Sequence, residues 1–522
     1  MYRKTPDNQL AFEDFYLPFG GKLRSNNRWV LLAKMVPWDT VESFYAEQFS
    51  KDDQGAPAKS ARLAFGALII KERLGASDEE VVEQIRENPY LQYFLGFHEF
   101  RDEAPFDPSM FVHFRKRFDL DQLNHINEEI VFAEQAEQEE KTASTSEDDD
   151  SDDNTSSGGN NGKLIVDATC TPADIRYPTD VSLINEAREK SEQIIDTLFE
   201  PLKGQRKKPR TYRQKARRQF LRYSKSRKRP ARQTRKALGQ QLRFVRRNLK
   251  TIGQLAEDVP LTLLSRYQYH NLLVIHELYR QQQWMYDQRC HRLSGRIVSI
   301  SQPHVRPIVR GKASAPTEFG AKLSASLVNG AVFLDRLDWD PFNESGDLIG
   351  QIETYKKRFG HYPKSVHADT IYRTRDNRNF CKKYGIRLSG PPLGRPPKKT
   401  QENTQELQTR KKQQRQDELD RIPIEGKFGQ SKRRFSLNRV MAKLSITSKT
   451  AIAITFIVIN LEKWLQKLFF CLFACWQKPS TTVTKALYAI LKAIRQLLRI
   501  NCQVKLCSQQ LLRYANLYLQ TE

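Results

Sequence analysis

Residues 163 to 169 read Lys163-Leu-Ile-Val-Asp167-Ala-Thr, a short apolar run that leads into a carboxylate. The run is typical of a buried strand, where an acid is disruptive unless it has a cation as partner. A second run of this kind, Ser365 to Ala368, ends at Asp369. Two carboxylates at the ends of neighbouring strands would meet at one mouth of a sheet. This arrangement favours a shared functional site over two accidental strand ends.

The elements around these two strands decide the fold class. Asn329-Gly330 is a strong hairpin turn signal between two alternating runs, and helical patterns separate the later strands. The expected elements are strand 164–166, hairpin strands 321–327 and 331–337, helix 346–359, strand 365–368, helix 376–384, strand 386–389 and a further helix. With one large helical insertion at about residues 185–300, this is the element order of an RNase H-like α/β fold, in which helices flank a mixed sheet.

The formal net charge of +25 is concentrated in one part of the chain. Residues 203–250 contain 21 basic and no acidic side chains, whereas a solvated helix face usually interleaves both signs. Such a run attracts a polyanion by counterion release, and nucleic acid is the commonest polyanion. The segment holds too few apolar residues for a conventional core. We therefore expect basic helices that lie along DNA, with contacts from Arg227, Lys228 and Arg229.

Residues 1–133 are expected to form a helical DNA-binding domain. Helical periodicity runs over residues 61–74, Ser77 opens a second helix, and a third spans residues 110–118. Three short helices with a basic last member resemble a helix-turn-helix unit, which would place that member in a major groove. A generic helical bundle is the alternative. The expected DNA contacts of the third helix are Arg115, Lys116 and Arg117.

Two further segments complete the expected domain organisation. Residues 134–162 hold ten acidic side chains among Ser, Thr, Asn and Gly, which predicts a disordered acidic linker. The expected RNase H-like domain then covers residues 163–445, and a C-terminal helical region of unknown role covers residues 446–522. The seven cysteines are scattered, as in reduced cytoplasmic proteins. The longest apolar run, 451–461, is too short for a bilayer, so we expect a soluble cytoplasmic protein without a membrane partner.

A third carboxylate should come from the helix after the last strand. Cleavage of a phosphodiester by two metal ions requires carboxylates that hold the ions close together. Arg421, Glu425 and Lys432 are spaced by four and seven residues, so they share one helix face, although Pro423 places Arg421 before the regular helix. One carboxylate with two phosphate-binding cations is chemically coherent, which favours Glu425. The competing acids are Glu402, Glu406, Asp417, Glu418 and Asp420.

The local sequences around these acids resemble a known family. Val166-Asp167-Ala-Thr169, His367-Ala-Asp369-x2-Tyr372 and Ile424-Glu425-Gly-Lys-Phe-Gly-Gln-x-Lys432-Arg-Arg are similar to the three catalytic blocks of bacterial insertion-sequence transposases. The resemblance is to the insertion-sequence-five family within the insertion-sequence-four superfamily. The superfamily signature Tyr-x2-Arg-x3-Glu-x6-Lys is matched by Arg421, Glu425 and Lys432, but Glu418 stands at the position of the Tyr. His367 is expected to be a packing residue and is left out of the catalytic set.

The resemblance implies a DDE transposase that binds the ends of an insertion sequence. Asp167, Asp369 and Glu425 would be both the catalytic and the metal-binding residues for two Mg2+ ions, for which Mn2+ could substitute. Water would cleave the DNA, and the freed 3′-OH would attack target DNA. The expected partners are double-stranded DNA, at the terminal inverted repeats and the target, and a second copy of the chain in a homodimer. The alternatives are a nuclease or resolvase on the same fold, and an inactive DNA-binding repressor.

Overall fold

The structure is a computed structural model that describes residues 15–17, 20–49, 57–143, 159–309, 317–391, 394 and 404–477. The chain divides into two compact units, Met1–Glu462 and Lys463–Glu522. The first unit contains every candidate site residue discussed below.

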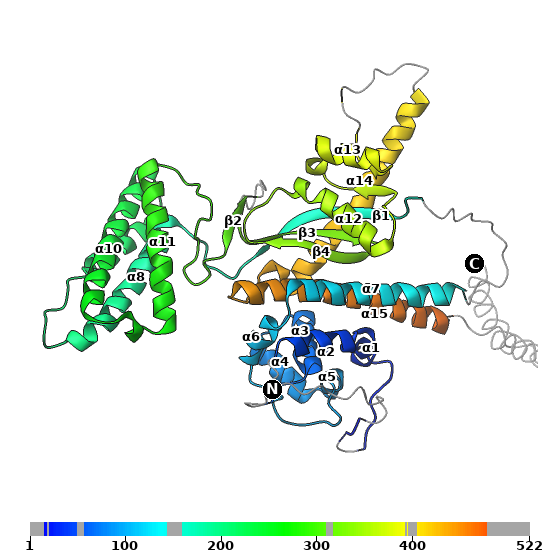
Figure 1. The fold of residues 1–522 in the computed structure, drawn as a ribbon, viewed down its shortest axis with the longest axis horizontal. Helices are drawn as coiled ribbons and strands as arrows, with labels where there is room; N and C mark the ends of the chain where they lie inside the picture. Colours follow the sequence, from blue (N-terminus) through cyan, green and yellow to red (C-terminus); the bar gives the residue numbers. More distant parts are fainter. Residues whose placement is uncertain are drawn as a thin grey trace, which may run out of the picture. The chain divides into compact units, whose positions relative to one another are not determined.

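A mixed six-stranded sheet lies at the centre of the first unit (Figure 1). Strand β1 (Lys163–Pro172) pairs antiparallel with β3 (Thr317–Val328) and parallel with β5 (Ser365–His367). Strand β6 (Arg387–Leu388) continues the sheet beyond β5. The order along the sheet is β2-β3-β1-β5-β6, and β4 also pairs with β3. The remaining strands are β2 (Arg306–Val309) and β4 (Ala331–Asp338).

Helices pack against both faces of the sheet. Leu164, Val166 and Val366 belong to a buried cluster to which α12 (Leu348–Phe359) contributes apolar side chains. Because successive side chains of a strand point to opposite faces, Lys163 and Asp167 lie on the other face. There, Lys163 Nζ lies 2.8 Å from a carboxylate oxygen of Asp420, which is in α14 (Thr404–Arg434). The proposed first acid therefore points to the face that α14 covers.

The predicted hairpin is confirmed by the pairing of β3 with β4. Asn329 and Gly330 have φ values of 49° and 76°, as a two-residue hairpin loop of type I′ requires. The predicted order of helices and strands after the hairpin is also observed, with α12, β5, α13 (Arg375–Lys383), β6 and α14. The short strand β2 was not predicted.

One expectation about β1 is wrong. Asp167 lies in the middle of the strand, since pairing with β3 continues as far as Pro172. The run after the acid is less apolar, so its sequence alone did not predict a strand. Hydrogen bonding to β3 extends it.

The N-terminal part of the first unit is helical. Ser60 and Ser77 cap α3 and α4 by accepting hydrogen bonds from the backbone N–H groups of Leu63 and Glu80. Residues 134–143, which were expected to belong to a disordered linker, form the end of α7, because Ala, Glu and Gln are good helix formers. Residues 144–158 of that linker lie outside the described residues. The helices are α1 (Arg28–Met35), α2 (Trp38–Glu47), α3 (Ala61–Leu74), α4 (Asp78–Glu87), α5 (Pro89–Phe94), α6 (Met110–Lys116) and α7 (Leu120–Ala143).

The insertion between β1 and β2 is a helical bundle with a core of its own. Helix α10 (Ala231–Asp258) places Leu242 and Val245 in a buried cluster with Ile275 and Leu278 of α11 (Arg266–Gln288). The expectation that this basic segment lacks a conventional core is therefore wrong, because its few apolar residues share one face of α10. The other helices of the insertion are α8 (Asp180–Phe199) and α9 (Arg213–Ser224).

Helix α14 continues through Pro423, so the expectation that Arg421 precedes the regular helix is wrong. Proline removes one backbone hydrogen bond, but Ile424 and Phe428 on the next turn are buried and hold the helix in place. Short 3-10 helices lie at Glu200–Leu202, Leu261–Leu263, Glu344–Gly346, Thr370–Tyr372 and Ser436–Asn438.

Helix α15 (Ser445–Gln477) is the last described element. Its segment Ser445–Phe469 is long and apolar enough to cross a membrane, but 78% of its most apolar window is buried inside the protein. A core helix of a soluble protein has this property, so the segment is weak evidence for a membrane span.

Candidate active site

The register of two parallel strands brings the first two acids to one level of the sheet. Ile165 of β1 is the partner of His367 of β5. Asp167 comes two residues after Ile165, and Asp369 comes two residues after His367. Both acids therefore lie just beyond the paired part of β1 and β5, at the same end of the two strands. Asp369 caps the 3-10 helix after β5, because its carboxylate accepts a 2.6 Å hydrogen bond from the backbone N–H of Thr370. This bond fixes the direction of the side chain.

The third acid reaches the same place from α14. The guanidinium of Arg421 lies 3.1 Å from a carboxylate oxygen of Asp369 and 3.1 Å from one of Glu425. Arg421 and Glu425 are one helical turn apart, so a single cation joins the two acids. The side chains of Asp369 and Glu425 are 52% and 54% exposed. Both carboxylates are thus open to a large substrate.

Asp167 is the inner member of the group. Burial raises its pKa to about 6, and the nearby carboxylates of Glu425 and Asp369 act in the same direction. The backbone N–H of Ala168, at 2.8 Å, and the charge of Arg421 oppose this rise. A buried carboxylate beside two others is unfavourable as an anion unless a cation compensates it. The group of acids is therefore suited to binding cations.

The donor set fits magnesium. Asp167, Asp369 and Glu425 offer only oxygen ligands, which Mg2+ and Mn2+ prefer. Arg421 already places one positive charge among them. The raised pKa of Asp167 is the second sign that this group needs positive charge.

The competing acids of α14 have other partners. Asp417 pairs with Arg387 and Asp420 with Lys163, each at 2.8 Å, while Glu418 is exposed. Glu425, in contrast, is joined to Asp369 through the guanidinium of Arg421. Glu402 lies outside the described residues, and Glu406 pairs with Arg410 in the first turns of the helix.

The basic end of α6 differs from its expected role. Arg115 is only 4% exposed, and its guanidinium donates two hydrogen bonds, of 2.6 and 3.1 Å, to Asp78. It is committed to the fold, so its assignment as a DNA contact is wrong. Arg117 is half-buried and donates to the hydroxyl of Tyr45, whereas Lys116 is exposed. Sequence spacing located the cations but not the direction in which each points.

The other expected DNA contacts lie in two places. Arg227, Lys228 and Arg229 are exposed in the loop between α9 and α10. Arg229 donates hydrogen bonds to the backbone carbonyls of Ser224 and Ser226, which stiffens the loop. Lys432 is half-buried near the end of α14, about two turns beyond Glu425.

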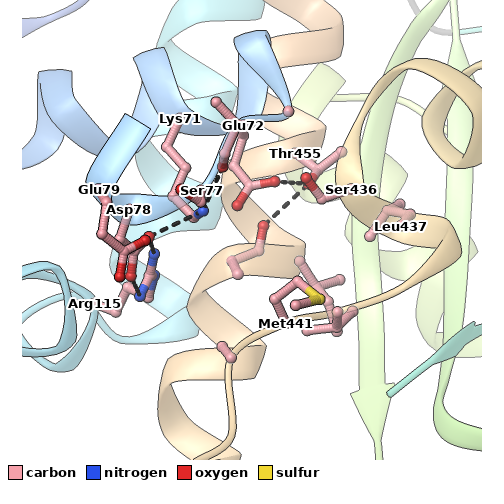
Figure 2. A pocket seen from close by; sticks show the side chains of 16 residues that line it. Lys71, Glu72, Ser77, Asp78, Glu79, Arg115, Ser436, Leu437, Met441 and Thr455 are labelled. Carbon is pink, nitrogen blue, oxygen red and sulfur yellow. Dashed lines mark hydrogen bonds and ion pairs between the residues drawn. The ribbon is translucent and has the colours of Figure 1, made fainter. Parts of the chain in front are cut away.

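A pocket of about 390 Å³ lies away from the three acids. Figure 2 shows Lys71, Asp78 and Arg115 joined on one side of it, while Glu72 turns toward Ser436 and Thr455. None of Asp167, Asp369 and Glu425 lines this pocket. A duplex binds along an open surface and needs no deep cavity, so the exposed acids remain the better candidate for chemistry on DNA.

Two family models match this chain. One, described as "Transposase DDE domain", covers residues 366–462, and the other, described as "Transposase domain (DUF772)", covers residues 18–117. The first includes Asp369, Arg421 and Glu425, and the second includes helices α1 to α6. Asp167 lies outside both matches. No solved structure matches the chain.

A curated protein of Rhizobium meliloti, "Uncharacterized protein ORF8 in nfe locus", is 32% identical over 158 residues. The aligned part is 30% of this chain and 68% of that protein. Both matched models describe transposase domains, which supports a transposase. The chain belongs to the family of this Rhizobium protein, and its matched domains support a DDE transposase.

Proposed function

We propose that this protein binds the ends of an insertion sequence of the insertion-sequence-five family, cleaves the DNA there and joins the 3′-OH ends to target DNA. The observation that supports this most directly is the meeting of Asp369 and Glu425 on the guanidinium of Arg421, beside the half-buried Asp167. The strand order also supports an RNase H-like fold, since the antiparallel strands β2, β3 and β4 lie on one side of β1 and the parallel strands β5 and β6 on the other.

The carboxylates of Asp167, Asp369 and Glu425 would hold two Mg2+ ions. Ions held in this way supply Lewis-acid stabilisation of the attacking and leaving oxygens in phosphodiester cleavage. Arg421, which contacts both exposed carboxylates, is the cation best placed to meet a phosphate at the same spot, and Lys432 would contact a phosphate further along α14. Lys116, Arg117 and the loop of Arg227, Lys228 and Arg229 would hold the duplex through its backbone.

The protein would act in the cytoplasm on double-stranded DNA, as a homodimer that holds two transposon ends. A nuclease on the same fold is the second candidate, because the same three acids would serve hydrolysis without joining.

The test uses the full chain, Mg2+ and linear duplexes that carry the DNA flanking the gene, with a plasmid as target. Strand cleavage at a fixed position followed by covalent joining to the plasmid is the expected result. Cleavage without joining would favour the nuclease. A chain that binds the duplex but neither cuts nor joins it would contradict the enzymatic proposal.

A further inference from the structure

A second group of possible metal ligands lies next to the proposed catalytic acids but shares no residue with them. His367 of β5 faces Asp417 and Asp420 of α14, and one ligand atom from each of the three lies within 4.8 Å of the others. His367 is fully buried, and Asp417 is 7% exposed. Strand β5 and helix α14, which are far apart in the chain, meet at this group.

The hydrogen bonds around His367 leave one ring nitrogen without a partner. Nε2 lies 3.0 Å from the hydroxyl oxygen of Ser365, while Nδ1 is buried and has no hydrogen-bond partner. A ring that donates its Nε2–H to Ser365 carries a lone pair on Nδ1. Histidines that bind metal ions commonly donate their other ring N–H to an oxygen in this way, which fixes the ring orientation.

The unpartnered nitrogen points at a carboxylate. Nδ1 lies 3.7 Å from an oxygen of Asp417, which is too long for an N–H···O hydrogen bond. Two ligands of one tetrahedral ion, at bond lengths of about 2.1 Å, lie about 3.4 Å apart. An ion between these two atoms would therefore require a shift of a few tenths of an ångström. Asp420 lies 3.8 Å from Nε2, the nitrogen that donates to Ser365, so its side chain would have to turn toward Nδ1 to become the third ligand.

The neighbouring cations are compatible with an added ion. Lys163 contacts Asp420 and has a side chain that is 58% exposed, so it can turn to solvent. Arg387 contacts both oxygens of Asp417 from one guanidinium nitrogen and is 43% exposed. The carboxylate of Asp417 can turn one oxygen toward an ion and keep the other on Arg387.

We infer that His367, Asp417 and Asp420 form a binding site for one divalent transition-metal ion, separate from the two ions of the proposed reaction. One imidazole with two carboxylates favours Zn2+ or Mn2+ over Mg2+ and Ca2+, which prefer sites made of oxygen ligands. The ion would pin α14 to β5 and so fix the distance between the helix that bears Glu425 and the strand that leads to Asp369. Binding of the ion does not depend on the proposed function.

The test measures zinc binding to the full chain after removal of metals with a chelator. The background variant Asp369→Asn/Glu425→Gln removes two of the proposed catalytic ligands and should still bind one Zn2+ per chain. In that background, Asp420→Asn should weaken zinc binding at least about tenfold. The matched control is Glu418→Gln, an exposed acid on the same helix, which should leave zinc affinity unchanged.

A second measurement covers the case in which a variant misfolds. His367→Gln replaces a buried residue, so its fold is checked by circular dichroism, and Asp420→Asn decides the matter if His367→Gln does not fold. Loading with Co2+ should produce a visible absorption band that Asp420→Asn lacks. A background variant that binds no zinc, or an Asp420→Asn variant that binds it as tightly as the control, would overturn the inference.

Discussion

Asp167 combines a proposed catalytic position with a cost in stability. Burial and two neighbouring carboxylates raise its pKa to about 6, against 3.8 for the free group. The unfolded chain releases this proton at lower pH than the folded chain, so stability falls as pH rises from about 4 to 6 and stays reduced above that. This rise in the pKa of Asp167 corresponds to a loss of about 3 kcal/mol in the free energy of unfolding at neutral pH. The carboxylate is therefore a destabilising residue at neutral pH when no cation is bound.

The first prediction follows from the fall in stability that the charged Asp167 causes. Without divalent ions, Asp167→Asn should raise the melting temperature at pH 8, where Asp167 is charged, and have little effect at pH 4, where it is protonated. Adding Mg2+ at pH 8 should stabilise the natural protein more than the variant, because the variant has lost one of the three carboxylates proposed to bind the ions. Equal melting temperatures at pH 8 would show that Asp167 is not electrostatically strained.

The second prediction concerns the choice of Glu425 as third acid. Glu425→Gln should abolish DNA cleavage and leave duplex affinity within about twofold, since Gln keeps the size of the side chain and removes the charge. Glu418→Gln, on the exposed side of the same helix, should cleave like the natural protein. Gel assays of cleavage and binding on one duplex measure both. Loss of cleavage in Glu418→Gln alone would assign the third acid to Glu418.

Sequence reasoning at the residue scale was strongest where spacing alone decides the geometry. Arg421 and Glu425 are four apart on a helix, so their contact follows from helical periodicity. Arg115 shows the limit, because only the packing of α6 against α4 determines that it turns inward to Asp78. His367 is expected to be a packing residue, and this expectation omits Asp417 and Asp420, which are about 50 positions away in the chain, so that no local pattern predicts their contact.

At the scale of elements, the basic loop between α9 and α10 makes the third prediction. Replacing Arg227, Lys228 and Arg229 with Gln should weaken binding to all duplex sequences alike, because phosphate contacts carry no base information. The dependence of log affinity on log salt should become shallower by about 0.9 for each lost contact. Lys357→Gln/Lys382→Gln/Lys383→Gln removes three cations from α12 and α13 and serves as the control. An unchanged slope in the loop variant would contradict the phosphate assignment.

The insertion bundle makes the fourth prediction. Leu278 of α11 is fully buried against α8 and α10, so Leu278→Ala should lower the opening free energy of the bundle's amide groups by about 2 to 4 kcal/mol. Hydrogen exchange measures this locally. Leu263 is 46% exposed, and Leu263→Ala should change the same amide groups by less than about 0.5 kcal/mol. Similar effects of both variants would show that the bundle has no packed core.

For this insertion the prediction of helices is correct and the expectation that no core forms is wrong, and both results have the same physical cause. Its helices could be predicted, because helical periodicity and the absence of breakers are local properties. Its core could not be predicted from α10 alone, since the apolar side chains that complete it come from α8 and α11. Strand β2 was missed for a related reason, because four residues hold too little pattern and only pairing with β3 defines them.

Across the first unit, a buried acid joins the N-terminal helices to the proposed catalytic helix. Glu462 of α15 is 3% exposed and pairs with Arg73 of α3 and with Arg434 in the last turn of α14. The fifth prediction is that Glu462→Gln destabilises the fold by about 3 kcal/mol, because the buried guanidinium of Arg73 loses its counter-charge. Thermal melting measures this.

The matched control for that variant is Glu406→Gln. Glu406 forms an exposed pair with Arg410 on α14, and such pairs contribute less than about 0.5 kcal/mol. If both variants melt like the natural protein, the buried contact does not couple the N-terminal helices to α14.

The proposed acids are far apart in the chain, at positions 167, 369 and 425, and this spacing has a consequence during synthesis. A ribosome completes the N-terminal helices and the basic loop long before it reaches Glu425. A nascent chain at that stage has the proposed surfaces for holding a duplex but lacks the third carboxylate. Such a chain also lacks α15, so the buried guanidinium of Arg73 has no counter-charge until Glu462 has been made. The N-terminal helices would therefore reach their full stability only after Glu425 has been made, so a stable surface for holding the duplex and the complete set of proposed acids would arise together.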